Sequence, residues 1–174
     1  MTPQEEQRLK DQFVVDNPYA RDGLRAALMF NPLYAQGANR RQIHHDWIAY
    51  MDVSARKYVQ QQPLDTFLTD VCELKNYMNQ RHANLFLPAG FKYSHAQKSF
   101  AVFLKYRWCQ GLISTPPSCP IDRGVLYRLG RPFSSWSWTK MEECKYMPTY
   151  IKLQREADAA QMTVAQMELL WFSH

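Results

Sequence analysis

The sequence predicts an all-α fold, because helix-start signals recur along the chain and strand signals do not. Thr2-Pro3-x-Glu5 is a capping box with proline at the first helical position, and Thr163-x-x-Gln166 is a second capping box near the end. Between these signals, apolar side chains recur at helical rather than alternating spacing. A chain of 174 residues is long enough for one compact domain with a buried core. We therefore expect residues 1–174 to form a single helical domain.

The individual helices follow from caps, from apolar spacing and from the residues that break it. Asn31-Pro32 and Gly37 interrupt the pattern after the second helix, and Asp65 is a suitable N-cap for the fourth. The predicted helices cover residues 3–15, 17–30, 40–61, 66–80, 95–109, 123–129 and 164–172.

Composition narrows the classes of function. A net charge of +5 and an aromatic content of 14% are compatible with nucleic-acid binding, because Lys and Arg neutralise phosphates and aromatic rings stack on bases. The four cysteines lack the close spacing of zinc or iron–sulfur ligands, so neither a zinc site nor an iron–sulfur cluster is expected. The opening residues lack the apolar core of a signal peptide, and no apolar run reaches the roughly 18 residues that span a bilayer. We expect a cytoplasmic monomer without a membrane partner.

The stretch at residues 94–109, SHAQKSFAVFLKYRWC, places a lysine near the start of a very apolar helix. Ser94-x-x-Gln97 has the form of a capping box, which would put Lys98 in the first turn. The positive end of the helix dipole disfavours the ammonium form there, and a neutral lysine amine is a nucleophile. Lys98 is therefore a candidate catalytic residue.

A proline-rich bend, STPPSCP, then leads to Ile121-Asp122-Arg123. Asp122 is a natural N-cap for the short helix RGVLYRL, which Gly130 would terminate. Its carboxylate would face Lys98 only if the two helix starts pack together. Asp122 is the second candidate catalytic residue.

The segments QKSFAVFLKY and CPIDRGVLYRL, in this order, resemble the helix-hairpin-helix DNA glycosylases, and most closely the archaeal 8-oxoguanine glycosylase branch. The resemblance covers about residues 85–130, where the usual glycine-rich hairpin is replaced by LPAGFKYSHAQK. It implies a compact helical fold and excision of an oxidised or otherwise modified base from duplex DNA, with β-lyase activity and without a cofactor. It also implies that Lys98 attacks the sugar to form a Schiff base, and that Asp122 activates the lysine and stabilises charge on the sugar. Both repair and defence against modified phage DNA fit such an activity.

Two further groups of residues would support that reaction. Aromatic side chains recover part of the cost of flipping a base out of the stack, and basic side chains contact phosphate. The candidates for the base pocket are Trp108, Phe133, Trp136 and Trp138, although core packing is an alternative role for Trp108. The candidates for DNA-backbone contacts are Lys92, His95, Arg123, Arg128 and Arg131.

Two other functions remain open at this stage. The spacing of Arg40 and His45 in NRRQIHHDW resembles the R-x(4–6)-H pattern of HEPN ribonucleases, small all-α enzymes in which such a pair acts on RNA. A non-catalytic helical domain that binds nucleic acid or protein is the other alternative. It predicts that substituting Lys98 and Asp122 leaves function intact, whereas the ribonuclease hypothesis places the loss at Arg40 and His45.

Overall fold

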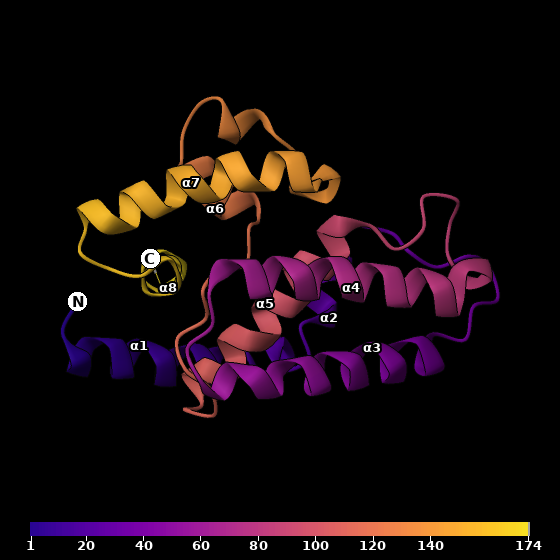
Figure 1. Cartoon of the computed structure of the whole chain (residues 1–174), viewed down its shortest axis with the longest axis horizontal. Coiled ribbons are helices and arrows are strands. Elements are labelled where there is room, and N and C mark those ends of the chain that lie inside the picture. Colours follow the sequence, from indigo (N-terminus) through magenta and orange to yellow (C-terminus); the bar gives the residue numbers. More distant parts are fainter. Residues whose placement is uncertain (174) are drawn as a thin grey trace.

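The computed structural model describes residues 1–173, which form helices joined by turns (Figure 1). No strand occurs among these residues; an isolated bridge joins Tyr34 to Phe86. The predicted all-α class is therefore confirmed. The α-helices are α1 (Pro3–Asp16), α2 (Leu24–Leu28), α3 (Arg40–Ala55), α4 (Leu64–His82), α5 (Tyr93–Cys109), α6 (Arg123–Arg128), α7 (Glu143–Ala159) and α8 (Val164–Phe172). Short 3₁₀ turns lie at Pro18–Ala20, Arg56–Val59, Ala83–Leu85, Phe133–Ser135 and Trp138–Lys140.

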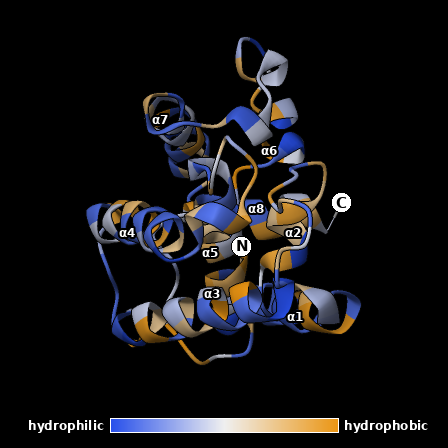
Figure 2. Cartoon of the chain, turned by 90° about the vertical axis from the view of Figure 1, so that its right-hand side faces the viewer, coloured by the Kyte–Doolittle hydropathy of each residue, from blue (hydrophilic) through white to orange (hydrophobic). Residues whose placement is uncertain are grey.

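Helix α5 is the centre of the bundle. It contacts α1, α2, α3 and α4, and Figure 2 shows it enclosed by its neighbours. Every residue of α5 except Arg107 is buried, as its almost uniformly apolar sequence predicts. The ring of Phe100, for example, packs against Tyr58 and Phe67 with centroids 5.7 and 5.8 Å away. Burying one such side chain contributes about 1.5–3 kcal/mol, so α5 anchors the core around which the site is built.

The polar residues of α5 are buried too, and each needs a partner because an unpaired buried polar group is costly. Ser99 accepts a hydrogen bond from the Trp47 indole at 3.0 Å and donates to the His95 carbonyl at 2.8 Å. Ser94 donates to the Thr139 carbonyl at 3.0 Å. These bonds fix the helix in register with α3 and with the turn at Trp138–Lys140.

A glycine allows α2 to approach α5 closely. Gly23 precedes α2 with a positive φ of 70°, which side-chain-bearing residues rarely adopt. A Cβ atom at this position would lie 2.2 Å from the Ser99 carbonyl oxygen. Only glycine therefore permits this contact, which sets the position of α2 and of the residues that follow it.

Several helix predictions need correction. The predicted helix over residues 17–30 contains only the 3₁₀ turn Pro18–Ala20 and α2, because Gly23 with its positive φ separates them. Asp65 lies in the first turn of α4, whose N-cap is Pro63.

Helix α5 begins at Tyr93 rather than after Ser94, because the His95 ring accepts the Lys92 backbone N–H at 3.0 Å and so performs the capping role predicted for Gln97. Lys98 consequently lies in the second turn, where the helix dipole acts less strongly than in the first.

Helix α7 was not predicted at all, although it lies alongside α8 (Figure 1). Pro148 lies inside this helix. Because proline normally interrupts a helix, the sequence did not indicate one here. None of the helices in residues 1–173 combines the length and the apolar character needed to cross a bilayer.

Candidate active site

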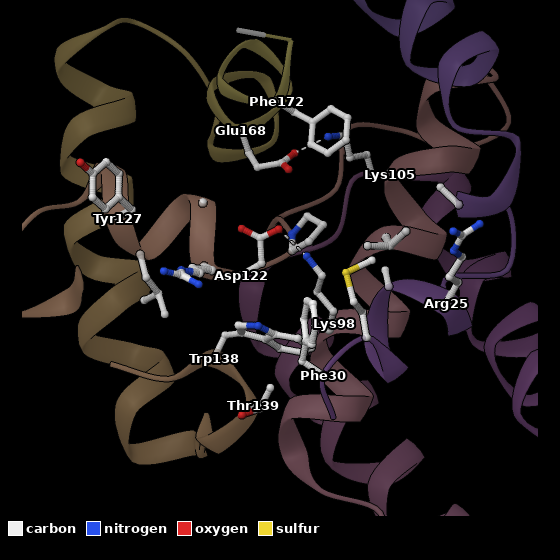
Figure 3. Close-up of a pocket in the computed structure, with 18 of the residues that line it drawn as sticks. Arg25, Phe30, Lys98, Lys105, Asp122, Tyr127, Trp138, Thr139, Glu168 and Phe172 are labelled. Carbon is white, nitrogen blue, oxygen red and sulfur yellow. Dashed lines mark hydrogen bonds and ion pairs between the residues drawn. The ribbon is translucent and has the colours of Figure 1, made fainter. Parts of the chain in front are cut away.

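The Lys98 amine and the Asp122 carboxylate form an ion pair, with Nζ 2.6 Å from Oδ2 (Figure 3). The Lys98 side chain is 8% exposed and that of Asp122 is 30% exposed, so the aspartate is the member more open to solvent. The sequence left open whether the starts of α5 and α6 pack together, and this distance shows that they do. At this distance a proton can pass directly between the two groups.

A buried amide clamp holds the two residues together. Gln97 donates from Nε2 to the Ile121 carbonyl at 2.9 Å and accepts the Ile121 N–H at 3.3 Å. Gln97 directly precedes Lys98 and Ile121 directly precedes Asp122, so this pair of bonds fixes the start of α6 beside α5. The polar residue predicted to cap α5 instead aligns the site.

Asp122 uses its two oxygens for different purposes. Oδ1 accepts the Val125 N–H at 3.0 Å and caps α6, which leaves Oδ2 for Lys98. Burial by itself raises the pKa of Asp122, but the positive charge of Lys98 and the backbone N–H groups of Val125 and Gly124 outweigh it. The net pKa of Asp122 lies below its ordinary value, so the carboxylate is ionised in the resting protein.

The ion pair lies in the wall of a cleft of about 1070 Å³ that residues from α1, α2, α5, α6 and α8 surround. Trp138 also lines the cleft, and its ring centroid is 5.9 Å from the Lys98 amine. Trp136, from the same loop, lies in the wall as well. Of these two predicted pocket residues, both line the cleft and Trp138 lies beside the candidate nucleophile. The volume is sufficient for a nucleotide-sized ligand.

A second buried pair in the same cleft was not predicted. The Lys105 amine is 2.7 Å from a Glu168 oxygen, and each side chain is only 5% exposed. The two groups are close but not aligned for a hydrogen bond, and neither of these atoms has another polar partner. The rings of Phe13 and Phe172 lie 4.2 and 4.3 Å from the Lys105 amine. An anion, a cation and two aromatic faces therefore converge with unused hydrogen-bonding capacity (Figure 3).

Exposed aromatic side chains also gather at this cleft. Among residues 1–173, the exposed members of this class are Tyr19, Phe30, Tyr127 and Phe172, and all of them line it. Aromatic rings left in water favour a ligand that stacks on them. The sequence did not single these residues out, because three belong to segments far from the Lys98–Asp122 region.

The remaining predicted pocket residues lie elsewhere. Trp108 is 2% exposed and packs in a core cluster with Lys10 over its ring, so the pocket role predicted for it is wrong and core packing is its role. Its position ten residues beyond Lys98 carries it to the far end of α5. Phe133 is half-buried against Trp136, with ring centroids 5.1 Å apart, and supports that wall without lining it.

The predicted DNA-backbone contacts divide into exposed and buried residues. Arg123, Arg128 and Arg131 are exposed, and Arg123 lines the cleft. Lys92 is half-buried and donates to Asn31, and burial lowers its pKa. His95 is fully buried and donates from Nε2 to the Asn31 carbonyl at 3.0 Å, so the phosphate contact predicted for it is wrong.

Arg40 and His45, the candidate ribonuclease pair, have different partners. The Arg40 guanidinium lies over the Tyr34 ring at 5.0 Å, whereas the exposed His45 ring is 3.3 Å from Asp46. Asp46 is itself held by Arg81 at 2.6 Å. Each of the two side chains is thus engaged by a different partner.

Comparisons with known proteins found no match. No known protein family, curated protein sequence or solved structure matches it. Within the part of the chain that the structure describes, no group of three or more His, Cys, Asp or Glu side chains is arranged to hold a metal ion. The function is therefore argued from the geometry of the cleft.

Proposed function

We propose that this protein is a DNA glycosylase with lyase activity, acting on an oxidised or otherwise modified base. The observation that carries the proposal is the Lys98–Asp122 pair, 2.6 Å apart in the wall of a nucleotide-sized cleft. A half-exposed lysine on a helix surface would not support a nucleophilic role. A buried lysine that faces a carboxylate and an open cavity has both a means of losing its proton and access to a substrate.

The reaction follows from these two groups. Asp122 Oδ2 accepts the proton of the Lys98 ammonium, and the freed amine attacks the sugar carbon C1′. The C1′–N bond breaks as the new N–C1′ bond forms, and the base leaves with the electron pair and takes the proton that Asp122 had accepted, which returns Asp122 to its ionised form. Opening of the sugar ring then gives a protonated Schiff base and a hydroxyl at C4′. Asp122, when ionised, stabilises positive charge that develops on the sugar.

Lyase activity completes the sequence. Loss of a proton from C2′ of the Schiff base expels the 3′-phosphate, and hydrolysis of the imine returns the free Lys98 amine. Neither step consumes an oxidant or a reductant, and hydrolysis of the imine consumes one water molecule.

The Lys105–Glu168 pair supplies the recognition site for the base. Lys105 lies seven residues after Lys98, on the order of 10 Å along the helix axis, which is about the length of a nucleoside. The ammonium donates to a carbonyl oxygen of the base and the carboxylate accepts from a neighbouring N–H, while the exposed ring of Phe172 offers a face for stacking. This arrangement favours a base with a carbonyl group next to a ring N–H.

The connection that leads into α5 is held in place by hydrogen bonds. It consists of the 3₁₀ turn Ala83–Leu85 and a turn through Gly90, and it joins α4 to α5. Asn79 holds the turn with two hydrogen bonds of 2.8 Å to the backbone of Phe91. Gly90 has a φ of 63°, and a Cβ atom there would be 2.7 Å from the Asn79 side chain.

Borohydride trapping tests the proposal. Duplexes that carry a panel of modified bases or an abasic site are incubated with the protein and reduced. We expect a covalent adduct that is lost in Lys98→Gln and retained in Lys145→Gln, a control lysine exposed on α7 and outside the cleft. Asp122→Asn is expected to slow the reaction by about 100-fold or more. Absence of an adduct with every substrate would overturn lysine attack and favour a non-catalytic binding domain.

A further inference from the structure

Phe30 is the most exposed large apolar side chain among residues 1–173, at 85%. It follows α2 and lies at the edge of the cleft that contains Lys98 (Figure 3). A phenylalanine in this position contributes little to the core, because most of its surface stays in water. Its presence at the cleft therefore needs another explanation.

The backbone of Phe30 is held in an unusual conformation. Its φ is 56°, in the left-handed region that a bulky side chain rarely adopts. Such a conformation persists only where the surroundings enforce it, and it concentrates at functional positions. Since the ring itself is exposed, its own packing does not enforce this backbone.

The neighbouring residue supplies the restraint. Asn31 is fully buried and donates from Nδ2 to the Ser94 hydroxyl at 3.1 Å. Its carbonyl accepts from His95 Nε2 at 3.0 Å, and its N–H donates to the Leu28 carbonyl at 3.1 Å. Phe30 is thus attached rigidly to the first turn of α5, the helix that carries Lys98.

We propose that Phe30 inserts into the base stack of duplex DNA and fills the gap left by the flipped nucleotide. The inference rests on the proposed glycosylase function and adds the residue that makes excision from a duplex possible. A flipped nucleotide leaves its neighbours unstacked, and an inserted apolar side chain compensates for part of that loss. A backbone that is held in place before binding loses little conformational freedom when the side chain inserts.

The proposal separates duplex from single-stranded substrates. In a single strand no stack has to be kept open, so Phe30 contributes little there. In a duplex, loss of one stacked ring is expected to lower the rate by about 10-fold to 100-fold. A merely structural role for Phe30 would lower both rates equally.

The test measures the rate of borohydride-trapped adduct on a duplex with one abasic site and on the same strand alone. Phe30→Ala should react at least 10-fold more slowly on the duplex and within about twofold of the unsubstituted protein on the single strand. Phe30→Trp, which keeps a stacking face, should retain most of the duplex rate. Val53→Ala, an exposed apolar residue of α3 outside the cleft, is the matched control and should change neither rate.

The outcomes distinguish the two proposals. Equal duplex rates for Phe30→Ala and the unsubstituted protein would overturn insertion while leaving the glycosylase reaction intact, and so would an equal loss on both substrates. If the unsubstituted protein forms no adduct on either substrate, the proposed function fails and the insertion proposal fails with it. Binding of Phe30 to a protein partner instead would give the first of these results.

Discussion

Acidification should destabilise the fold through His95. Its Nδ1 accepts the Lys92 N–H and its Nε2 donates to the Asn31 carbonyl, so the buried ring fits only in its neutral form. Protonating Nδ1 would place its N–H against the Lys92 N–H, so that two hydrogen-bond donors face each other. Burial is the main cause that lowers the pKa of His95 from 6.5 to about 4, and the Lys92 charge adds to it, against the opposing hydrogen bond to Asn31. At about 1.4 kcal/mol per pH unit, protonation costs the folded state about 3 kcal/mol.

The sign and the pH range follow from that lowered pKa. Between pH 6.5 and about 4 the unfolded chain binds the proton and the folded chain does not, so stability falls as the pH falls through this range. From pH 7 to pH 5 the loss attributable to His95 should be about 2 kcal/mol. Urea unfolding at the two pH values measures it.

The variant His95→Gln removes the titrating ring and serves as the reference. It should be less stable than the unsubstituted protein at pH 7, and the gap should shrink by about 2 kcal/mol at pH 5. The pKa of His44 is also lowered by burial, but this contribution is present in both proteins and cancels. Parallel pH dependences of the two proteins would refute the reasoning.

Two further predictions concern close packing and the second ion pair. Gly23→Ala should lower the free energy of unfolding, measured in urea, by about 3 kcal/mol, because it adds both left-handed backbone strain and a clash with Ser99. Gly37→Ala adds the same strain in open space and should lower it by about 1 kcal/mol. Equal losses in the two variants would contradict the close contact at Gly23. Glu168→Gln should cost about 3–5 kcal/mol, because it leaves the Lys105 ammonium buried without a counter-charge, and adding Lys105→Met should restore most of the loss. A single variant within about 1 kcal/mol of the unsubstituted protein would show that the pair does not matter for stability.

The sequence was sufficient for the parts of the site that local signals encode. Asp122 was predicted as the cap of a short helix, and the structure shows it in that role. That Lys98 and Asp122 act together was only what the glycosylase resemblance implied, since the sequence left open whether the two helix starts pack together, and the capping argument placed Lys98 one turn too early. The Gln97 clamp explains why: the residue predicted to cap α5 makes a long-range contact to Ile121 instead.

Other parts of the site depend on tertiary packing that local patterns do not contain. Glu168 and Lys105 meet only because α8 packs near α5, and Phe13 joins them from α1. His95 was predicted to contact DNA phosphate because basic residues lie near it in the sequence. The buried Asn31 instead holds it inside the core. Phe30 carries no signal in the sequence, since its exposure and its positive φ are visible only in the folded chain.

The measurement that tests the central claim most directly is the position of the trapped sugar on the protein. After borohydride reduction on an abasic duplex, proteolysis and mass spectrometry identify the modified lysine. The account predicts modification at the Nζ atom of Lys98, beside Asp122, and none at Lys105, which is held by Glu168 deeper in the same cleft. Modification at Lys105 or at an exposed lysine, with Lys98 unmodified, would contradict the assignment of the nucleophile.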